Sequence, residues 1–153
     1  MARKTFNEKL NDSKNFPEIV ELTDPKMIQR FRGTRMLIAP PLAYDKLMRM
    51  VPEGKVITSD AIRDYLARNH GADFTCPLTA GLFINIAARA SAERENDETP
   101  YWRTLKKDGE LNEKYPGGIE LQKALLEAEG HTVIQRGKKF FVRDYKEKQY
   151  ELK

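Results

Sequence analysis

Cys76 is the one thiol of this 153-residue chain, and its surroundings decide what nucleophilic chemistry the sequence could support. It directly precedes Pro77, a residue type favoured at the first position of a helix, where the helix dipole stabilises a thiolate. A base could come only from His70 or His131. Because a lone cysteine among apolar neighbours is more often a small core side chain, two interpretations stay open: a reactive thiol and a buried apolar residue.

A second chemically distinctive segment is PYWR at 100–103, which contains the one tryptophan. It is followed by YPGG at 115–118 and by EAEGH at 127–131. Phosphate-binding, dinucleotide-binding, zinc-protease and C-x-x-C motifs are absent, and two histidines make a zinc site improbable. We therefore expect no metal site and no cofactor, and one cysteine excludes an internal disulfide framework.

Two helices with a short connection are predicted in the middle of the chain. The first is DAIRDYLARNH at 60–70, which Thr58, Ser59 or Asp60 can cap. The second starts at Pro77 and runs through small residues to about position 95. This layout is typical of a helix-turn-helix, in which the start of the second helix is the candidate contact surface.

The remaining elements complete a winged-helix arrangement. Amphipathic helices are predicted at 42–51 and 117–131, and a β-hairpin is predicted around Gly137. A short helix at 6–14, an extended segment at 17–24 and a strand at 34–41 precede them. We expect a mainly α fold with a small β component: a winged helix-turn-helix domain at 41–153, with an N-terminal extension at 1–40.

Charge is distributed unevenly along the chain. The net charge is +4 at pH 7, which weakly favours an anionic partner. Residues 1–52 hold ten Lys or Arg against six Asp or Glu, and residues 131–153 hold seven against three, so each end carries +4 and the centre carries −4. If the partner is a nucleic acid, it would contact the basic ends of the sequence rather than its acidic centre. The alternative is that these charges form an ordinary solvated surface without a specific partner.

No apolar run is long enough to span a membrane, and the first residues lack the pattern of a secretory signal. We expect a monomeric cytoplasmic protein without membrane contact.

The order of the motifs resembles one known family. PEGKVITSDAIRDYLA at 52–67, the small-residue helix, PYWR and YPGGIELQKALLEAEGH at 115–131 are similar to the DNA-binding domain of the alkylguanine-DNA alkyltransferases, over roughly residues 45–135. The resemblance implies double-stranded DNA as the partner, with alkylated guanine as the lesion. It implies a base pocket whose candidate residues are Tyr101, Trp102, Arg103, Tyr115, Gly117, Gly118 and Glu129.

Two departures from the family pattern concern its reactive residues. The nucleophilic cysteine falls on Tyr101, and the histidine that serves as its base falls on Trp102. A phenol with a pKa near 10 is a poor nucleophile, and an indole N–H can only donate. We therefore expect no catalytic residue here, and we expect Glu129 to accept a hydrogen bond from the Trp102 indole. The alkyltransferase-like proteins, which have a bulky aromatic in place of that cysteine and bind alkylated guanine without transferring the group, are similar in this respect.

The contact surface for DNA is also altered relative to the family. The tyrosine that helps rotate the target nucleotide corresponds to Ser59. The arginine inserted into the duplex falls near Thr79 or is absent, depending on how the turn between the two helices is aligned. Leu78 or Phe83 could fill the vacated stack instead. The candidate DNA-binding residues are Lys55, Thr58, Ser59, Pro77, Leu78, Thr79 and Ala80.

Three functions remain open from the sequence. The first is a non-enzymatic protein that recognises alkylated or otherwise unusual bases and signals them to further repair proteins. The second is a winged-helix DNA or protein interaction module without lesion preference, in which Tyr101 and Trp102 merely fill a former pocket. The third is a methylated-DNA-protein cysteine methyltransferase that uses Cys76.

Overall fold

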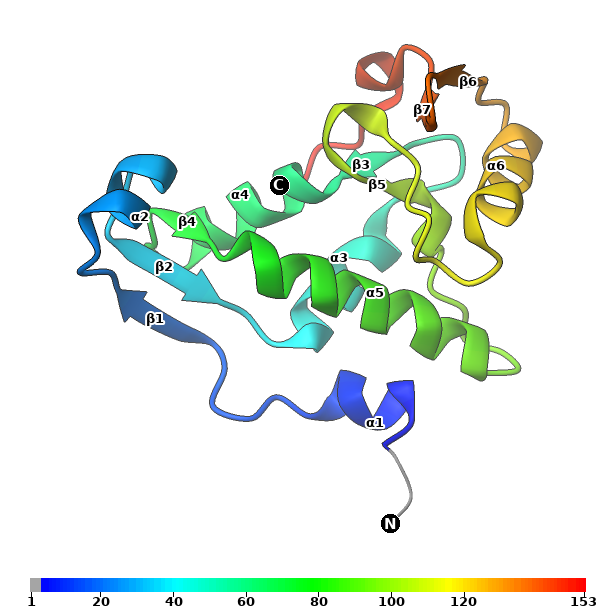
Figure 1. Ribbon diagram of the computed structural model, residues 1–153. Coiled ribbons are helices and arrows are strands. Elements are labelled where there is room, and N and C mark those ends of the chain that lie inside the picture. The colour runs from blue at the N-terminus through cyan, green and yellow to red at the C-terminus, as the bar shows by residue number, and fades with distance from the viewer. Residues whose placement is uncertain (1–3) are drawn as a thin grey trace.

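A helix-turn-helix lies at the centre of the molecule. The computed structural model describes residues 4–153, so the first three residues of the predicted extension lie outside the described part (Figure 1). Helix α4 (Ser59–Asn69) is followed by the two-residue strand β4 (Phe74–Thr75) and by α5 (Pro77–Glu93), the longest helix of the described chain. The Thr58 hydroxyl caps α4 by accepting from the Ala61 N–H at 3.4 Å. The structure thus confirms the predicted pair of helices.

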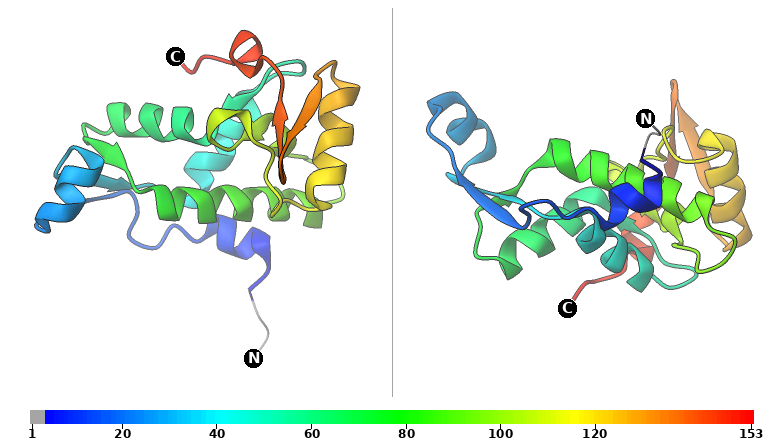
Figure 2. Two further views of the ribbon diagram at one scale, coloured as in Figure 1. Left: turned by 45° about the horizontal axis from the view of Figure 1, so that its top comes forward. Right: turned by 90° about the horizontal axis from the view of Figure 1, so that it is seen from below.

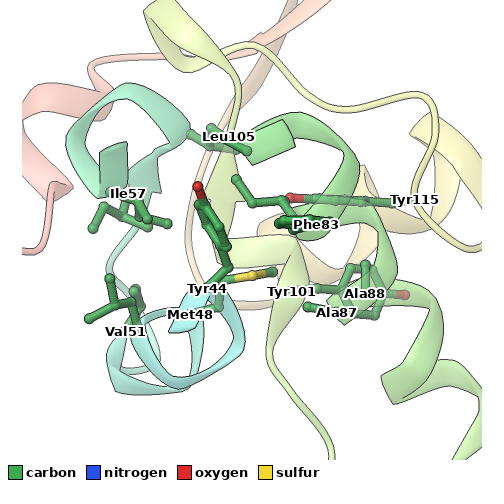
Figure 3. Close-up of a cluster of buried hydrophobic side chains, with 14 of the residues drawn as sticks. Tyr44, Met48, Val51, Ile57, Phe83, Ala87, Ala88, Tyr101, Leu105 and Tyr115 are labelled. Atoms are coloured by element: carbon green, nitrogen blue, oxygen red, sulfur yellow. The ribbon is translucent and has the colours of Figure 1, made fainter. Parts of the chain in front are cut away.

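The main core forms where α3 (Pro41–Met50) crosses α5. Tyr44 is fully buried, and its ring lies 6.1 Å from that of Phe83, which is 9% exposed. Figure 3 shows this cluster of buried side chains, which includes Tyr44, Met48, Val51, Ile57, Phe83, Ala87, Ala88, Tyr101, Leu105 and Tyr115. Small residues on α5 let α3 approach closely, because alanine side chains add little bulk at the crossing.

The N-terminal segment contributes a sheet and a helix. Its elements are α1 (Phe6–Asn11), β1 (Glu18–Glu21), α2 (Pro25–Phe31) and β2 (Arg35–Ile38). β1 pairs with β2 in antiparallel fashion, and β2 pairs with β4 in parallel, which gives the order β1-β2-β4. The sheet therefore ties the N-terminal segment to the turn of the helix-turn-helix.

Helix α1 is held against the C-terminal end of α5. The Glu93 carboxylate accepts hydrogen bonds from the backbone N–H groups of Phe6 and Asn7, at 2.9 and 3.0 Å. The Asn7 side chain donates to the Ala90 carbonyl at 2.9 Å. Leu10, which is 3% exposed, joins the same core as the residues of 41–153. Residues of the range 1–40 therefore pack directly onto the predicted domain.

The C-terminal part supplies short strands, one helix and the wing. β3 (Ile57–Thr58) pairs in parallel with β5 (Thr104–Leu105), α6 (Gly118–Ala128) follows, and β6 (Val133–Arg136) and β7 (Lys139–Val142) form an antiparallel hairpin. Short 3₁₀ turns occupy 101–103, 107–109 and 145–148. The fold is mainly α with a small β component, and both the helix-turn-helix and the terminal hairpin are present.

Three details differ from the prediction. Helix α2 is absent from the predicted elements, although Asp24 caps it and Pro25 stands at its first position; none of its side chains is buried. The first helix ends at Asn11 rather than at residue 14. The helix predicted at 117–131 is not cleanly amphipathic: its apolar Leu121 is 41% exposed, whereas its polar Gln122 is fully buried. Gln122 can be buried because its amide forms hydrogen bonds with the backbone of Asn112 and of Trp102.

Candidate nucleic-acid interface

The first turn of α5 is presented to solvent. Leu78 is 83% exposed and Leu82, one turn further on, is 57% exposed, although both are large apolar residues. Gly81 lies beside them on the same exposed side, and no atom lies within 4 Å of where a Cβ would stand there. Exposed leucines on neighbouring turns of a helix typically indicate a contact surface rather than a solvated face.

A groove lies between this part of α5 and the segment that follows β5. Its volume is about 660 Å³. Its lining residues come from the start of α4, the first half of α5, and the stretches 104–107 and 112–115: Ser59, Pro77, Leu78, Thr79, Gly81, Leu82, Ile84, Asn85, Thr104, Leu105, Lys106, Lys107, Asn112, Glu113, Lys114 and Tyr115. Apolar walls combine with two amide side chains and three lysines, a composition suited to a flat polar ring with phosphates nearby.

The wall formed by 104–118 is held in place by buried hydrogen bonds. Tyr115, 2% exposed, donates from its hydroxyl to the Thr104 carbonyl at 2.8 Å. Gln122 accepts from the Asn112 N–H at 2.7 Å and donates to the Trp102 carbonyl at 3.1 Å. The Thr104 hydroxyl is buried beside the groove and has no hydrogen-bond partner among the described residues. These buried hydrogen bonds hold the wall in a fixed position beside α5.

Tyr101 and Trp102 lie in the core behind this wall. They are 5% and 7% exposed, and the Tyr101 ring meets those of Trp102 and Tyr115 edge-on, with centroids 5.5 and 5.2 Å apart. Burial, followed by the charge of Glu98, raises the pKa of the Tyr101 phenol. Its hydroxyl faces the Pro116 carbonyl at 3.5 Å. Tyr101 is thus a neutral, packed side chain at physiological pH.

Glu129 gathers the polar groups next to this aromatic cluster. Its carboxylate accepts from the Trp102 indole N–H at 2.9 Å, from the Arg103 guanidinium at 2.7 to 3.1 Å, and from the Gly54 N–H at 3.3 Å. Burial by itself would raise the pKa of the Glu129 carboxyl, but the bonds from Arg103 and Trp102 outweigh burial and lower the pKa below 4.5. The hydrogen bond expected between Trp102 and Glu129 is present.

His131 lies beside this cluster and predicts a pH dependence of stability. It is 7% exposed, and its Nε2 has no hydrogen-bond partner among the described residues. Burial lowers the pKa of His131 below 6.5, although the Glu129 charge opposes this effect; Lys148 and Arg103 reinforce it. Because the unfolded state then binds the proton first, the free energy of unfolding should fall as the pH drops below about 6.5.

The histidine contribution can be separated by substitution. In His131→Gln, the fall in unfolding free energy that begins near pH 6.5 should disappear, as measured by urea titrations between pH 5 and 8. His70→Gln, at the exposed end of α4, is the matched control and should keep it. An unchanged pH profile in His131→Gln would show that burial of this ring does not govern the acid response.

Of the predicted base-pocket residues, only Tyr115 lines the groove. Tyr101 and Trp102 belong to the hydrophobic core and do not line the groove. Arg103 and Glu129 form the buried ion pair described above. Gly117 and Gly118 form the turn into α6, where Gly117 has a φ of 79° and a Cβ would lie 2.5 Å from Leu121. The glycines therefore serve the backbone turn.

The predicted DNA-contact residues divide into two groups. Ser59, Pro77, Leu78 and Thr79 all line the groove. Lys55 is exposed in the turn before β3, away from the groove lining. The side chains of Thr58 and Ala80 are 3% and 1% exposed, because Thr58 caps α4 and Ala80 faces the core; they are therefore absent from the exposed surface. Phe83 is likewise buried, so of the two side chains predicted to fill the base stack only Leu78 is exposed.

Cys76 is the residue before α5, but it does not line the groove. Its thiol is partly buried, and its N–H donates to the Leu37 carbonyl at 2.9 Å. Within residues 4–153, no group of three or more His, Cys, Asp or Glu side chains could hold a metal ion. Over the same residues, no helix combines the length and the apolar character needed to cross a membrane.

Several groove residues were missed from the sequence. Leu82, Asn85, Asn112 and the lysines at 106, 107 and 114 were not predicted as site residues. The pair Lys106–Lys107 directly after PYWRTL was a visible signal, because adjacent cations near a candidate pocket favour phosphate contact. Asn85 and Asn112 had no such signal, since their proximity, with an Nδ2 to Oδ1 distance of 3.1 Å, depends on the fold.

The chain is similar to solved structures of alkyltransferase-like proteins. One is S. pombe Atl1 in complex with damaged DNA containing O6-carboxymethylguanine, at 21% sequence identity and a TM-score of 0.51. Another is S. pombe ATL in complex with DNA, at 18% identity and a TM-score of 0.50. Each alignment covers 73% of this chain and 94% of the other. The chain has an alkyltransferase-like fold. At these identities the likeness establishes the fold and leaves the function to be argued from the site.

No protein-family model matches the sequence. No curated protein matches it either.

Proposed function

We propose that this protein binds double-stranded DNA and holds an alkylated or otherwise unusual base in the groove, without transferring the alkyl group. The observation that carries the proposal is the groove itself. It combines an apolar wall ending in Tyr115, an exposed leucine at the start of the second helix of the helix-turn-helix, and a rim of lysines. A volume of about 660 Å³ is sufficient for an extruded base with a substituent.

The polar groups of the groove support recognition of a base edge. Asn85 and Asn112 line the groove as a hydrogen-bonded amide pair, Nδ2 of Asn112 donating to Oδ1 of Asn85 at 3.1 Å, and Thr104 beside them also lines it. Extruding a base costs a few kcal/mol, and least for a damaged or mispaired base, so a groove of this kind favours such bases even before specific contacts form. The solved structures with a similar fold hold DNA, which is consistent with this partner.

The residues of the PYWR segment do not provide a nucleophile that could accept an alkyl group. Tyr101 is buried, and its pKa is raised, so it is a neutral phenol rather than a nucleophile. The Trp102 N–H is bonded to Glu129 and cannot accept a proton. Cys76 is not part of the groove lining, which argues against the alternative of a methyltransferase that uses this thiol.

The second candidate is a winged-helix DNA or protein interaction module without lesion preference. The burial of Tyr101 and Trp102 favours it, because these rings fill the space that a base would need next to the PYWR segment. Under either function we propose a monomeric cytoplasmic protein. Because it would bind a lesion without removing the alkyl group, we propose further repair proteins as partners that complete the repair.

A binding comparison separates these functions. Fluorescence anisotropy should give tighter binding to a duplex with one O6-methylguanine than to the same duplex unmodified, at two salt concentrations. Equal affinities would favour the module without lesion preference. Incubation with DNA carrying a labelled methyl group should leave the protein unlabelled. Label on the protein that is lost in Cys76→Ser would instead support the methyltransferase.

A further inference from the structure

We propose that residues 4–14 form one side of a two-sided phosphate clamp on duplex DNA, with the exposed leucines of α5 between the two sides. The inference rests on the proposed DNA-binding function. It assigns a role to a segment that lies outside the predicted DNA-binding domain.

A second depression, the N-terminal hollow, lies on the other side of α5 from the groove. Its volume is about 310 Å³, and it is lined by Lys4, Lys9, Asp12, Lys14, Phe16, Pro41, Leu82, Phe83 and Ile86. Leu82 lines both the groove and this hollow. The views in Figures 1 and 2 agree that α1 and the segment after β5 flank α5 on opposite sides. The exposed side of α5 that carries Leu78 and Leu82, the α5 ridge, therefore lies between the two depressions.

Both depressions carry the same balance of charge. The N-terminal hollow has three lysines against Asp12, and the groove has three lysines against Glu113. Lys4 is paired with Asp12 at 2.7 Å, and Lys106 lies 3.5 Å from Glu113 and 3.7 Å from Glu110. Within residues 4–153, Lys9, Lys14, Lys107 and Lys114 make no ion pair. Two cations thus remain available on each side.

The N-terminal lysines stand on a firmly placed element. The carboxylate of Glu93 on α5 accepts hydrogen bonds from the backbone N–H groups of Phe6 and Asn7. Thr5 and Glu8 close a reciprocal cap at the start of α1. Lys9 extends over the Phe6 ring at 4.9 Å. The position of α1 relative to α5 is therefore set before any ligand binds.

Duplex DNA is the partner that this arrangement fits. A groove of DNA presents base edges at its centre and a row of phosphates on each side. The α5 ridge, with lysines on both sides, matches that pattern. An exposed leucine can enter between base steps, and the lysines on each side can neutralise a row of phosphates. The charge of the two sides is complementary to the two phosphate rows.

The experiment compares the salt dependence of DNA binding in two double variants. Lys9→Ala/Lys14→Ala and Lys107→Ala/Lys114→Ala should each reduce the slope of log K against log salt concentration by about 1 to 2, since each phosphate contact contributes about 0.9. The control, Lys46→Ala/Lys123→Ala, changes lysines of α3 and α6 that line neither depression and should keep the wild-type slope. Circular dichroism confirms that each variant is folded.

The outcomes distinguish this inference from the proposed function. Because phosphate contacts carry no sequence information, Lys9→Ala/Lys14→Ala should weaken binding to methylated and unmodified duplexes by the same factor. A wild-type slope in that variant, with lesion binding intact, would overturn the clamp and leave the proposed function standing. A loss confined to the methylated duplex would also overturn it. No binding of the wild-type protein to either duplex would remove the proposed function itself.

Discussion

Replacing Glu129 by alanine should lower the free energy of unfolding by about 3–5 kcal/mol, the range typical of breaking a buried ion pair by removing one partner. The side chains of Arg103 and Glu129 are 14% and 7% exposed, and their atoms approach to 2.7 Å. Without the carboxylate, the guanidinium loses its counter-ion, and the Trp102 indole N–H and the Gly54 N–H lose their acceptor. Urea denaturation at pH 7 measures the loss.

Glu127→Ala provides the matched control, because this glutamate is on the same helix but exposed, and its removal should change stability by about 0.5 kcal/mol or less. Trp102→Phe removes one donor and keeps the ion pair, so it should cost less than Glu129→Ala. A loss below about 1 kcal/mol in Glu129→Ala would mean that Arg103 finds solvent or another acceptor, and that the cluster does not support the wall of the groove.

Replacing Leu78 by alanine should weaken binding to a lesion-containing duplex about 10- to 100-fold, equivalent to about 1.4 to 2.8 kcal/mol. Leu78 is 83% exposed at the start of α5, lines the groove, and is the most exposed of its large apolar side chains, so it is placed to fill the space that an extruded base leaves. Its removal takes away the contact that offsets unstacking, while its exposure predicts an unchanged unfolding free energy. Anisotropy titrations with the methylated duplex test the first effect, and urea titrations test the second.

Leu121→Ala is the control for this prediction, since Leu121 is 41% exposed on α6 and lies outside the groove lining. It should bind the duplex as the wild-type protein does. If Leu78→Ala bound methylated DNA with wild-type affinity, Leu78 would not enter the base stack, and the lysine rim would remain as the source of affinity. A parallel loss on methylated and unmodified duplexes would indicate a general contact rather than one that follows base extrusion.

The two predictions concern opposite sides of the wall formed by residues 104–118. The Glu129 cluster stabilises the back of the wall, where Tyr101 and Trp102 are packed. The groove is in front of it, bounded by Tyr115 and by the first turn of α5. Tyr115 belongs to both, because its ring contacts Tyr101 while its hydroxyl holds the Thr104 carbonyl. The aromatic segment is thus positioned to support the groove rather than to touch its contents.

The elements of the fold were largely readable from the sequence because they depend on local signals. Pro77 indicated the start of α5, Thr58 was among the expected caps of α4, and Gly137 marked the hairpin turn. α2 was missed although Asp24 and Pro25 mark its start, because seven residues are too few to establish an apolar period. The parallel pairing of β3 with β5 was also missed, since two-residue strands whose partners are 47 positions apart carry no signal of their own.

The sequence by itself determined which groups could react. Its one thiol is Cys76, and PYWR offers only a phenol, an indole and a guanidinium; the hydrogen bond between Trp102 and Glu129 was expected from the family resemblance and is present. Only the tertiary structure decided which of these residues meet solvent. The type of a side chain sets its chemistry, but its exposure depends on contacts between segments that are distant in the sequence. Tyr101 is buried in the core against α3 and α5, whereas Leu78 at the start of α5 stays exposed. The same packing of distant segments sets the lysines of residues 4–14 beside α5, which no local pattern could indicate.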